Sequence, residues 1–131
     1  MDLNLKFLKV SNDFPNLINK GKAISLAMVG SYKGTCFWQE EDFFSSQNML
    51  LFRNKIITKN IAKFLVTVLT RKFKTVNDYN AIKKSNVLNE YVFLPSIKNN
   101  NPNMPNIPDW NFISTVRKTP SFRSGIQGLV L

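Results

Sequence analysis

The side chains that most often carry enzyme chemistry are scarce in this chain of 131 residues. It contains no His, which excludes a His general base, a Ser-His-Asp triad and a two-His metal motif. Its single Cys, Cys36, excludes an intrachain disulfide and a zinc site built on several thiolates. Because Cys36 stands in an apolar segment without a His to activate it, we expect an inert buried thiol rather than a nucleophile.

The acidic cluster Glu40-Glu41-Asp42 is a poor candidate for acid–base catalysis. Adjacent side chains point apart in most backbone conformations, so we expect a solvated loop rather than a paired dyad. Gly30 and Gly34 do not have the spacing of a nucleotide-binding loop, and no helix is expected directly after them. We therefore expect a protein that is not an enzyme by itself and that has no catalytic residue, no metal site and no cofactor.

The chemistry that the sequence does offer is electrostatic. The chain has 18 Lys+Arg against 8 Asp+Glu, a formal charge of +10 and a pI near 10.0. Such a balance favours a polyanionic partner, most often nucleic acid. The 17 Asn and 14 Lys, against 4 Arg, are also compatible with the bias of an AT-rich genome. Charge alone leaves both interpretations open.

The distribution of the charge favours a binding surface. Between Arg53 and Lys84 there are nine basic residues and one acidic residue, so this segment carries nine minus one, or +8, of the total +10. Solvated helix faces are commonly Lys-rich without any partner, and that alternative remains. If the segment does bind a polyanion, four cations of its predicted helix are the candidates for phosphate contacts: Lys59, Lys63, Arg71 and Lys74.

The hydrophobic pattern predicts an α+β (mixed α/β) fold, with a small twisted sheet, one main amphipathic helix and a C-terminal helix. Residues 24–38 predict a β-hairpin that reverses at 30–34, and residues 47–52 predict a third strand. Residues 58–74 predict the main helix, because their apolar residues follow i, i+3, i+4, i+7, i+8 spacing after a Thr58 N-cap.

The flanking segments have weaker patterns. We expect a single, partial domain over residues 1–118 and an irregular tail over residues 119–131. No apolar run is long enough to span a membrane and no signal peptide is present, so a soluble cytoplasmic protein is expected. The remaining elements expected within the domain are a short strand and loop (1–22), a helical turn (85–90), a strand (91–94), a loop (99–108) and a helix capped by Asp109.

The order of the motifs is the most specific feature of the sequence. The glycine-tipped hairpin runs into Cys36-Phe37-Trp38, and residues 42–48 lead into the third strand. Tyr91-Val92-Phe93-Leu94-Pro95 follows the main helix, and residues 108–113 open the last one. In this order the chain resembles the target-recognition domains in the DNA-specificity subunits of type I restriction–modification systems. It is most similar to the variants found in type IIG and related systems.

The resemblance implies a non-catalytic domain that reads part of a split sequence in duplex DNA. A modification methyltransferase subunit and a restriction subunit would supply the chemistry. The domain would dock on the methyltransferase through the helix that begins at Asp109. A second specificity half is a further candidate partner. Loops and turns would face the major groove. The positions that the resemblance assigns to DNA contact are Gly30, Ser31, Tyr32, Lys33, Gly34, Ser46, Gln47, Asn48, Asn77, Tyr79, Asn80, Lys83 and Lys84.

These residue types suit that role, but ordinary structural roles compete with it. Asn and Gln can pair with adenine, Lys can reach guanine or a phosphate, and glycine allows a close approach. Glycines in a hairpin commonly serve only the turn, Gln47 and Asn48 can cap a strand end, and Tyr79 can pack on the core. Two other functions remain: a half-subunit that binds the modification subunit without DNA affinity, and a recognition fragment of a fused restriction–methyltransferase.

Overall fold

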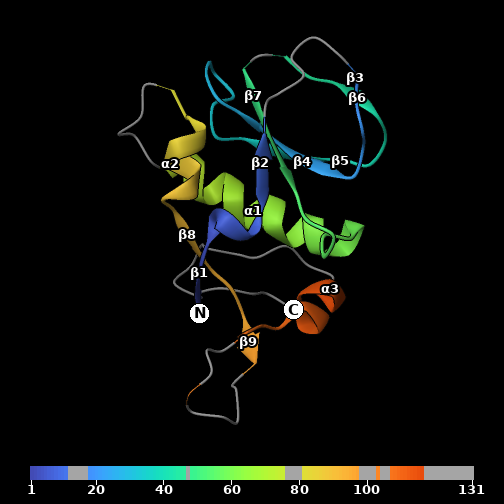
Figure 1. The fold of residues 1–131 in the computed structure, drawn as a ribbon, viewed down its shortest axis with the longest axis vertical. Coiled ribbons are helices and arrows are strands. Elements are labelled where there is room, and N and C mark those ends of the chain that lie inside the picture. Colours follow the sequence, from blue (N-terminus) through green and yellow to red (C-terminus); the bar gives the residue numbers. More distant parts are fainter. Residues whose placement is uncertain (12–17, 47, 76–80, 98–102, 104–106, 117–131) are drawn as a thin grey trace.

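The computed structural model describes residues 1–11, 18–46, 48–75, 81–97, 103 and 107–116. Within these residues the fold is α+β, as predicted, with one four-stranded antiparallel sheet, short two-stranded ribbons and three α-helices (Figure 1). The elements are β1 (Asp2–Asn4), η1 (Leu5–Phe7, a 3-10 turn), β2 (Lys9–Ser11), β3 (Ile18–Asn19), β4 (Ala23–Ala27), β5 (Cys36–Gln39), β6 (Phe43–Phe44), β7 (Met49–Arg53), α1 (Lys59–Thr75), α2 (Lys84–Leu88), β8 (Tyr91–Phe93), β9 (Ser96–Ile97), β10 (Ile107–Pro108) and α3 (Trp110–Thr115).

The four-stranded sheet has the order β2-β7-β4-β5, and all its pairs are antiparallel. The pairing of β4 with β5 confirms the predicted hairpin, and β7 confirms the third strand. Since side chains alternate between the two faces of a strand, one face gathers the apolar rows. These rows, which pack in one core cluster with α1, consist of Val10, Phe52, Ile24 and Trp38, then Leu50, Leu26 and Cys36.

Helix α1 is the centre of the core. It begins after Thr58, whose hydroxyl accepts a hydrogen bond from the Ile61 amide at 3.4 Å, as the N-cap prediction requires. Its apolar stripe is buried, with Leu65, Leu69 and Phe73 fully shielded from solvent. Figure 1 shows α1 between the sheet and a second layer formed by β1, β8 and α3. The helix is therefore covered on two sides, and one flank of it remains exposed to solvent.

The C-terminal elements are shorter than α1 but well anchored. The Asp109 carboxylate accepts a hydrogen bond from the Phe112 amide at 3.0 Å, which confirms the predicted cap of α3. Ile113 is fully buried, and the ring centroids of Trp110 and Phe7 lie 5.9 Å apart. The prediction of a loop over 99–108 is wrong at its end, because Ile107 and Pro108 form β10, which pairs with β9. The predicted tail lies outside the described residues.

Gly34 sets how closely the hairpin approaches α1. Its φ is +88°, and a Cβ built on it would lie 2.7 Å from the carbonyl carbon of Phe73 and 2.9 Å from the Lys74 nitrogen. Gly30 also has a positive φ, +85°, but a Cβ there would meet no atom of the described residues within 4 Å. The two glycines of the hairpin therefore have different roles: Gly30 serves the turn alone, and Gly34 serves both the turn and the contact with the helix.

This difference predicts unequal costs of substitution. Gly30→Ala should lower the free energy of unfolding by about 1 kcal/mol, because only the backbone conformation is strained. Gly34→Ala should cost about 2–4 kcal/mol, because the added methyl group meets helix backbone that cannot rotate away. Urea denaturation of both variants measures the difference. Equal destabilisation would contradict the close contact between Gly34 and α1.

Candidate functional site

Three of the predicted contact segments meet at Met28, the residue after β4. The Met28 amide donates to the carbonyl oxygen of Asn48, and its own carbonyl oxygen accepts from the Ile82 amide, both at 2.9 Å. The hairpin tip, the Ser46–Asn48 stretch and the Lys83–Lys84 pair adjoin these three residues in the sequence. The fold therefore brings these three segments, which are far apart in the chain, to the same end of the sheet.

The hairpin tip is open to solvent at this end. Gly30, Ser31 and Tyr32 are exposed, with 68% of the Tyr32 surface accessible, and Lys33 is half-buried. Local hydrogen bonds hold the turn, from the Lys33 amide to Gly30 at 3.1 Å and from the Thr35 amide to Tyr32 at 2.9 Å. Gly34 is buried against α1, so its packing accounts for the glycine there and we leave it out of the candidate surface.

The other two segments are also exposed. Ser46 and Asn48 face solvent, and the Ser46 hydroxyl accepts the Asn48 amide at 3.2 Å, which stabilises the entry into β7. Lys83 and Lys84 are exposed at the start of α2. The remaining predicted contact residues, which are Gln47, Asn77, Tyr79 and Asn80, lie outside the described residues.

The four predicted phosphate contacts of α1 occupy one exposed flank. Lys59, Lys63, Arg71 and Lys74 are all exposed, and at 100° per residue they fall within an arc of about 120°. The flank is as long as the helix, about 25 Å at 1.5 Å per residue. Because Lys74 adjoins Gly34, the C-terminal end of the flank lies beside the hairpin. We call this flank and the exposed residues at the Met28 end the basic surface.

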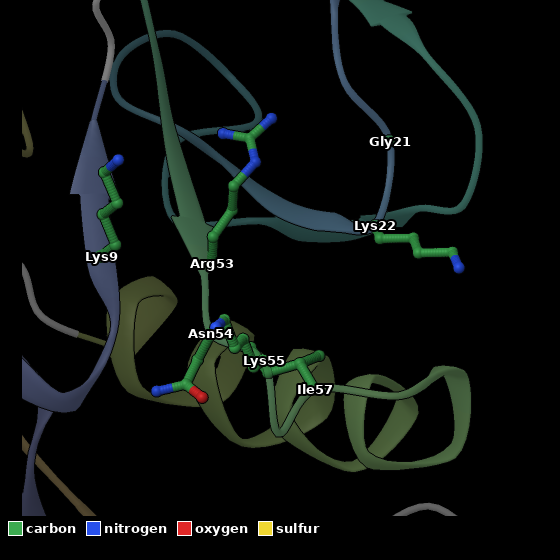
Figure 2. A pocket seen from close by; sticks show the side chains of 7 residues that line it. All are labelled: Lys9, Gly21, Lys22, Arg53, Asn54, Lys55 and Ile57. Atoms are coloured by element: carbon green, nitrogen blue, oxygen red, sulfur yellow. The ribbon is translucent and has the colours of Figure 1, made fainter.

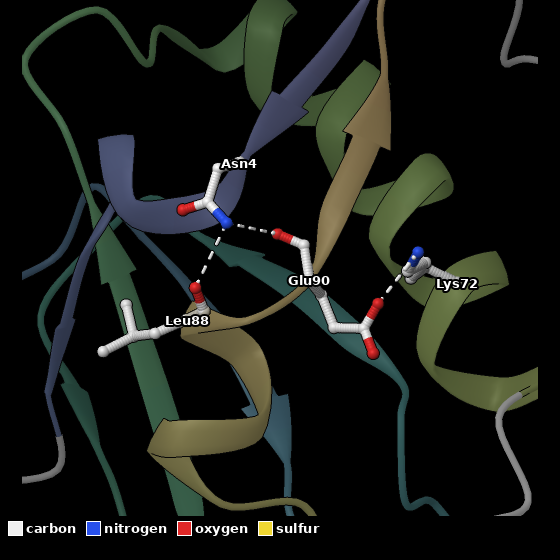
Figure 3. Close-up of polar contacts among 4 residues, drawn as sticks. All are labelled: Asn4, Lys72, Leu88 and Glu90. Atoms are coloured by element: carbon white, nitrogen blue, oxygen red, sulfur yellow. Dashed lines mark hydrogen bonds and ion pairs between the residues drawn. The ribbon is translucent and has the colours of Figure 1, made fainter.

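Lys72, in the same basic segment, serves the fold instead. Its Nζ lies 3.0 Å from Oε2 of Glu90, on the side of α1 that packs against the second layer (Figure 3). Asn4 extends this contact, because its side-chain amide donates to the carbonyl oxygens of Leu88 and Glu90, each at 3.2 Å. Lys72 therefore does not belong to the basic surface.

Sequence reasoning missed a second basic site. A hollow of about 380 Å³ is lined by Lys9, Lys22, Arg53 and Lys55, together with Gly21, Asn54 and Ile57 (Figure 2). Arg53 and Lys55 belong to the predicted basic segment, but Lys9 and Lys22 come from the N-terminal part. Only the pairing of β2 with β7 places Lys9 beside Arg53, and no local sequence pattern contains that information.

Cys36 has the environment of a structural thiol. It is buried, and this burial raises the pKa of the thiol to about 12, while a hydrogen bond with Thr70 lowers it by a smaller amount. The thiol is therefore protonated at neutral pH. Among the described residues no three His, Cys, Asp or Glu side chains gather as a metal site. None of the described helices is long and apolar enough to cross a membrane.

We expect Cys36 to react with a disulfide reagent only when the chain unfolds. At pH 8 the native protein should be modified no faster than it unfolds, and chain in denaturant should react at once. The unfolded thiol ionises before the native one, so the thiol's contribution to stability should be complete below about pH 8.5 and should fall as the pH rises toward 12. Stopped-flow absorbance measures the modification, and rapid modification of native protein would contradict the burial.

Comparison of the chain with protein-family models, with curated proteins and with solved structures finds no match. The candidate surfaces are therefore defined by the geometry and charge of this chain alone.

Proposed function

We propose that the chain is a non-catalytic module that recognises a sequence in duplex DNA within a restriction–modification system. A methyltransferase partner, on which the module docks, would supply the chemistry. The observation that carries the proposal is the junction at Met28, because it gathers exposed polar and basic residues from three separate segments at one end of the sheet. A cytoplasmic location follows from this function.

The cations of the basic surface would supply affinity for the phosphate backbone. Lys83 and Lys84 stand at the Met28 end, and the flank of α1 continues the positive charge along the helix. The four cations of this flank can neutralise up to four phosphates. Such contacts fix the position of a protein on the duplex without reading its sequence.

The exposed turns would read the bases. Ser31 and Tyr32 stand at the tip of a narrow reversal, and Asn48 adjoins it through the Met28 junction. An exposed Asn amide can form paired hydrogen bonds with adenine in the major groove, and Ser and Tyr hydroxyls can donate to or accept from base edges. Sequence preference should therefore depend on these side chains and not on the lysines of α1.

Partner docking through α3 would use its polar residues. Ile113 is buried in the core, and Trp110 packs toward Phe7, so the apolar side of this helix is already engaged within the chain. Asn111 and Thr115 are exposed. A methyltransferase subunit that contacts α3 would therefore meet a polar surface with few anchoring side chains, as in interfaces that form and dissociate.

The salt dependence of DNA binding tests the proposal. We expect a fluorescent duplex of mixed sequence to bind at low salt and to dissociate as salt rises, as measured by anisotropy. The double variant Lys63→Gln/Lys74→Gln should reduce the slope of log K against log salt by about 1.8, since each lost phosphate contact contributes about 0.9. Both residues are exposed, so thermal stability should not change.

Lys6→Gln provides the matched control, because Lys6 is exposed in η1, outside the basic surface. Its slope should equal that of the wild type. No binding at low salt, or an equal loss with Lys6→Gln, would contradict the proposal. Co-purification with a methyltransferase subunit without DNA affinity would instead support an interaction-only function.

Sequence preference makes a separate prediction about the hairpin tip. Selection from a random duplex pool should enrich a motif with the wild type, and Tyr32→Ala should weaken that enrichment while keeping the salt slope. Tyr91→Ala is the control, because Tyr91 is also exposed but lies on β8, in the second layer. If both variants enrich the same motif as the wild type, the tip does not read the bases.

A further inference from the structure

The basic hollow lies where the sheet meets the start of α1. Figure 2 shows Lys9 of β2 and Arg53 of β7 extending in the same direction, away from α1, while Lys22 extends from the start of β4. Lys55 and Ile57 complete the lining on the connection from β7 to the helix. The hollow thus gathers four cations, from β2, from β7, from the residue before β4 and from the turn after β7, with Ile57 as its one large apolar side chain.

The first unusual feature of the hollow is a pair of like charges. Lys9 and Arg53 are direct partners in the antiparallel register of β2 and β7. Side chains of such partners lie on the same face, and like charges there repel each other. Among the described residues no carboxylate lies within ion-pair distance of either side chain. The repulsion between the two strands therefore has no neutralising neighbour within this part of the chain.

The second unusual feature is the backbone of Lys22. Its φ is +59°, and it is the one non-glycine residue of the described part with a positive φ. The Lys22 amide donates to the Gln39 carbonyl oxygen at 2.6 Å, which holds the residue in this conformation. Glycine or asparagine would adopt this conformation at lower cost, so a lysine here is uncommon, and residues held in such conformations cluster at functional sites.

Hydrogen bonds hold the lining in place. The Arg53 guanidinium donates to the Lys20 carbonyl oxygen at 2.7 Å, which orients it without neutralising its charge. The Asn54 side chain donates to the Phe7 carbonyl oxygen at 2.7 Å and accepts the Ile56 amide at 2.8 Å. These contacts fix the turn that carries Lys55. The Arg53 guanidinium and the backbone that carries Lys55 are therefore positioned before any ligand arrives, which lowers the entropic cost of binding.

Two of the three acidic residues near the hollow accept hydrogen bonds from neutral donors. The backbone of Glu40 and Glu41 passes close to Gly21, at the edge of the hollow. Asp42 accepts the Gly21 amide at 2.9 Å, and Glu40 accepts the Trp38 indole N–H at 2.6 Å. None of the residues that line the hollow is acidic, so the lining itself carries four positive charges.

We propose that the hollow binds a phosphate-bearing ligand. Arg53 would form paired hydrogen bonds with phosphate oxygens, and Lys9, Lys22 and Lys55 would neutralise the remaining charge. A bound anion would relieve the repulsion between Lys9 and Arg53 and would give the strained Lys22 a partner. The volume of about 380 Å³ lies within the usual range of small-molecule sites and admits a pyrophosphate group. This inference does not depend on the proposed function.

The test uses inorganic pyrophosphate and the full chain. Pyrophosphate should raise the melting temperature of the wild type above that in sodium chloride of equal ionic strength, and calorimetry should give a one-to-one complex.

Lys9→Gln and Lys22→Gly should each weaken pyrophosphate binding about tenfold, the effect expected when one well-placed charge is lost. Without ligand both variants should melt at or above the wild-type temperature, because each removes an unfavourable feature. Lys6→Gln, at an exposed residue that neither lines the hollow nor belongs to the basic surface, should bind as the wild type does.

Two results would overturn the inference: no effect of pyrophosphate beyond that of sodium chloride, or wild-type affinity in both Lys9→Gln and Lys22→Gly.

Competition with duplex DNA identifies the source of the phosphate. If pyrophosphate displaces the duplex and Lys22→Gly weakens duplex binding, the hollow holds a phosphate of the DNA backbone. If pyrophosphate binds without displacing duplex, the ligand is a free phosphate compound. Pyrophosphate binding in a chain that does not bind duplex would support the hollow and contradict the proposed function.

Discussion

The burial of α1 on two sides is the constraint on which the rest of the structure depends. Leu65, Leu69 and Phe73 pack in the apolar cluster that holds the described elements together, and this fixes the rotation of the helix. Once that rotation is set, cations at the remaining helical positions share a single flank. The close contact at Gly34 then fixes the hairpin against the C-terminal end of the same helix. Core packing thus decides where the charge of the surface lies.

Local patterns carried most of what the sequence could predict. The periodicity of α1, the N-caps at Thr58 and Asp109 and the glycine-tipped hairpin each lie within a short stretch of chain, and the structure confirms them. Contacts between distant segments were beyond that reasoning. Neither the register of Lys9 with Arg53 nor the approach of Gly34 to Phe73 leaves a signal in a single sequence. The basic hollow was therefore missed, because the sequence shows its residues but not that they lie close together.

Net charge is a coarse guide to a binding surface. In the most basic segment, Lys72 neutralises Glu90 in a partly buried ion pair, whereas Lys63 and Lys74 remain on the exposed flank. Lys9 and Lys22, which lie outside that segment, contribute to the hollow. A count along the sequence gives all five lysines equal weight. Their surroundings separate those that hold the fold together from those that are open to a polyanion, and that separation is what a functional argument requires.

The junction at Met28 has a consequence for the evolution of the molecule. Its two hydrogen bonds join main-chain atoms only, so they impose no demand on the side chains of the neighbouring turns. The exposed residues at this end can therefore diverge among descendants while the scaffold below them is inherited unchanged. A turn exchanged between related genes would keep these main-chain bonds as long as it retains the two positive-φ glycines of the hairpin.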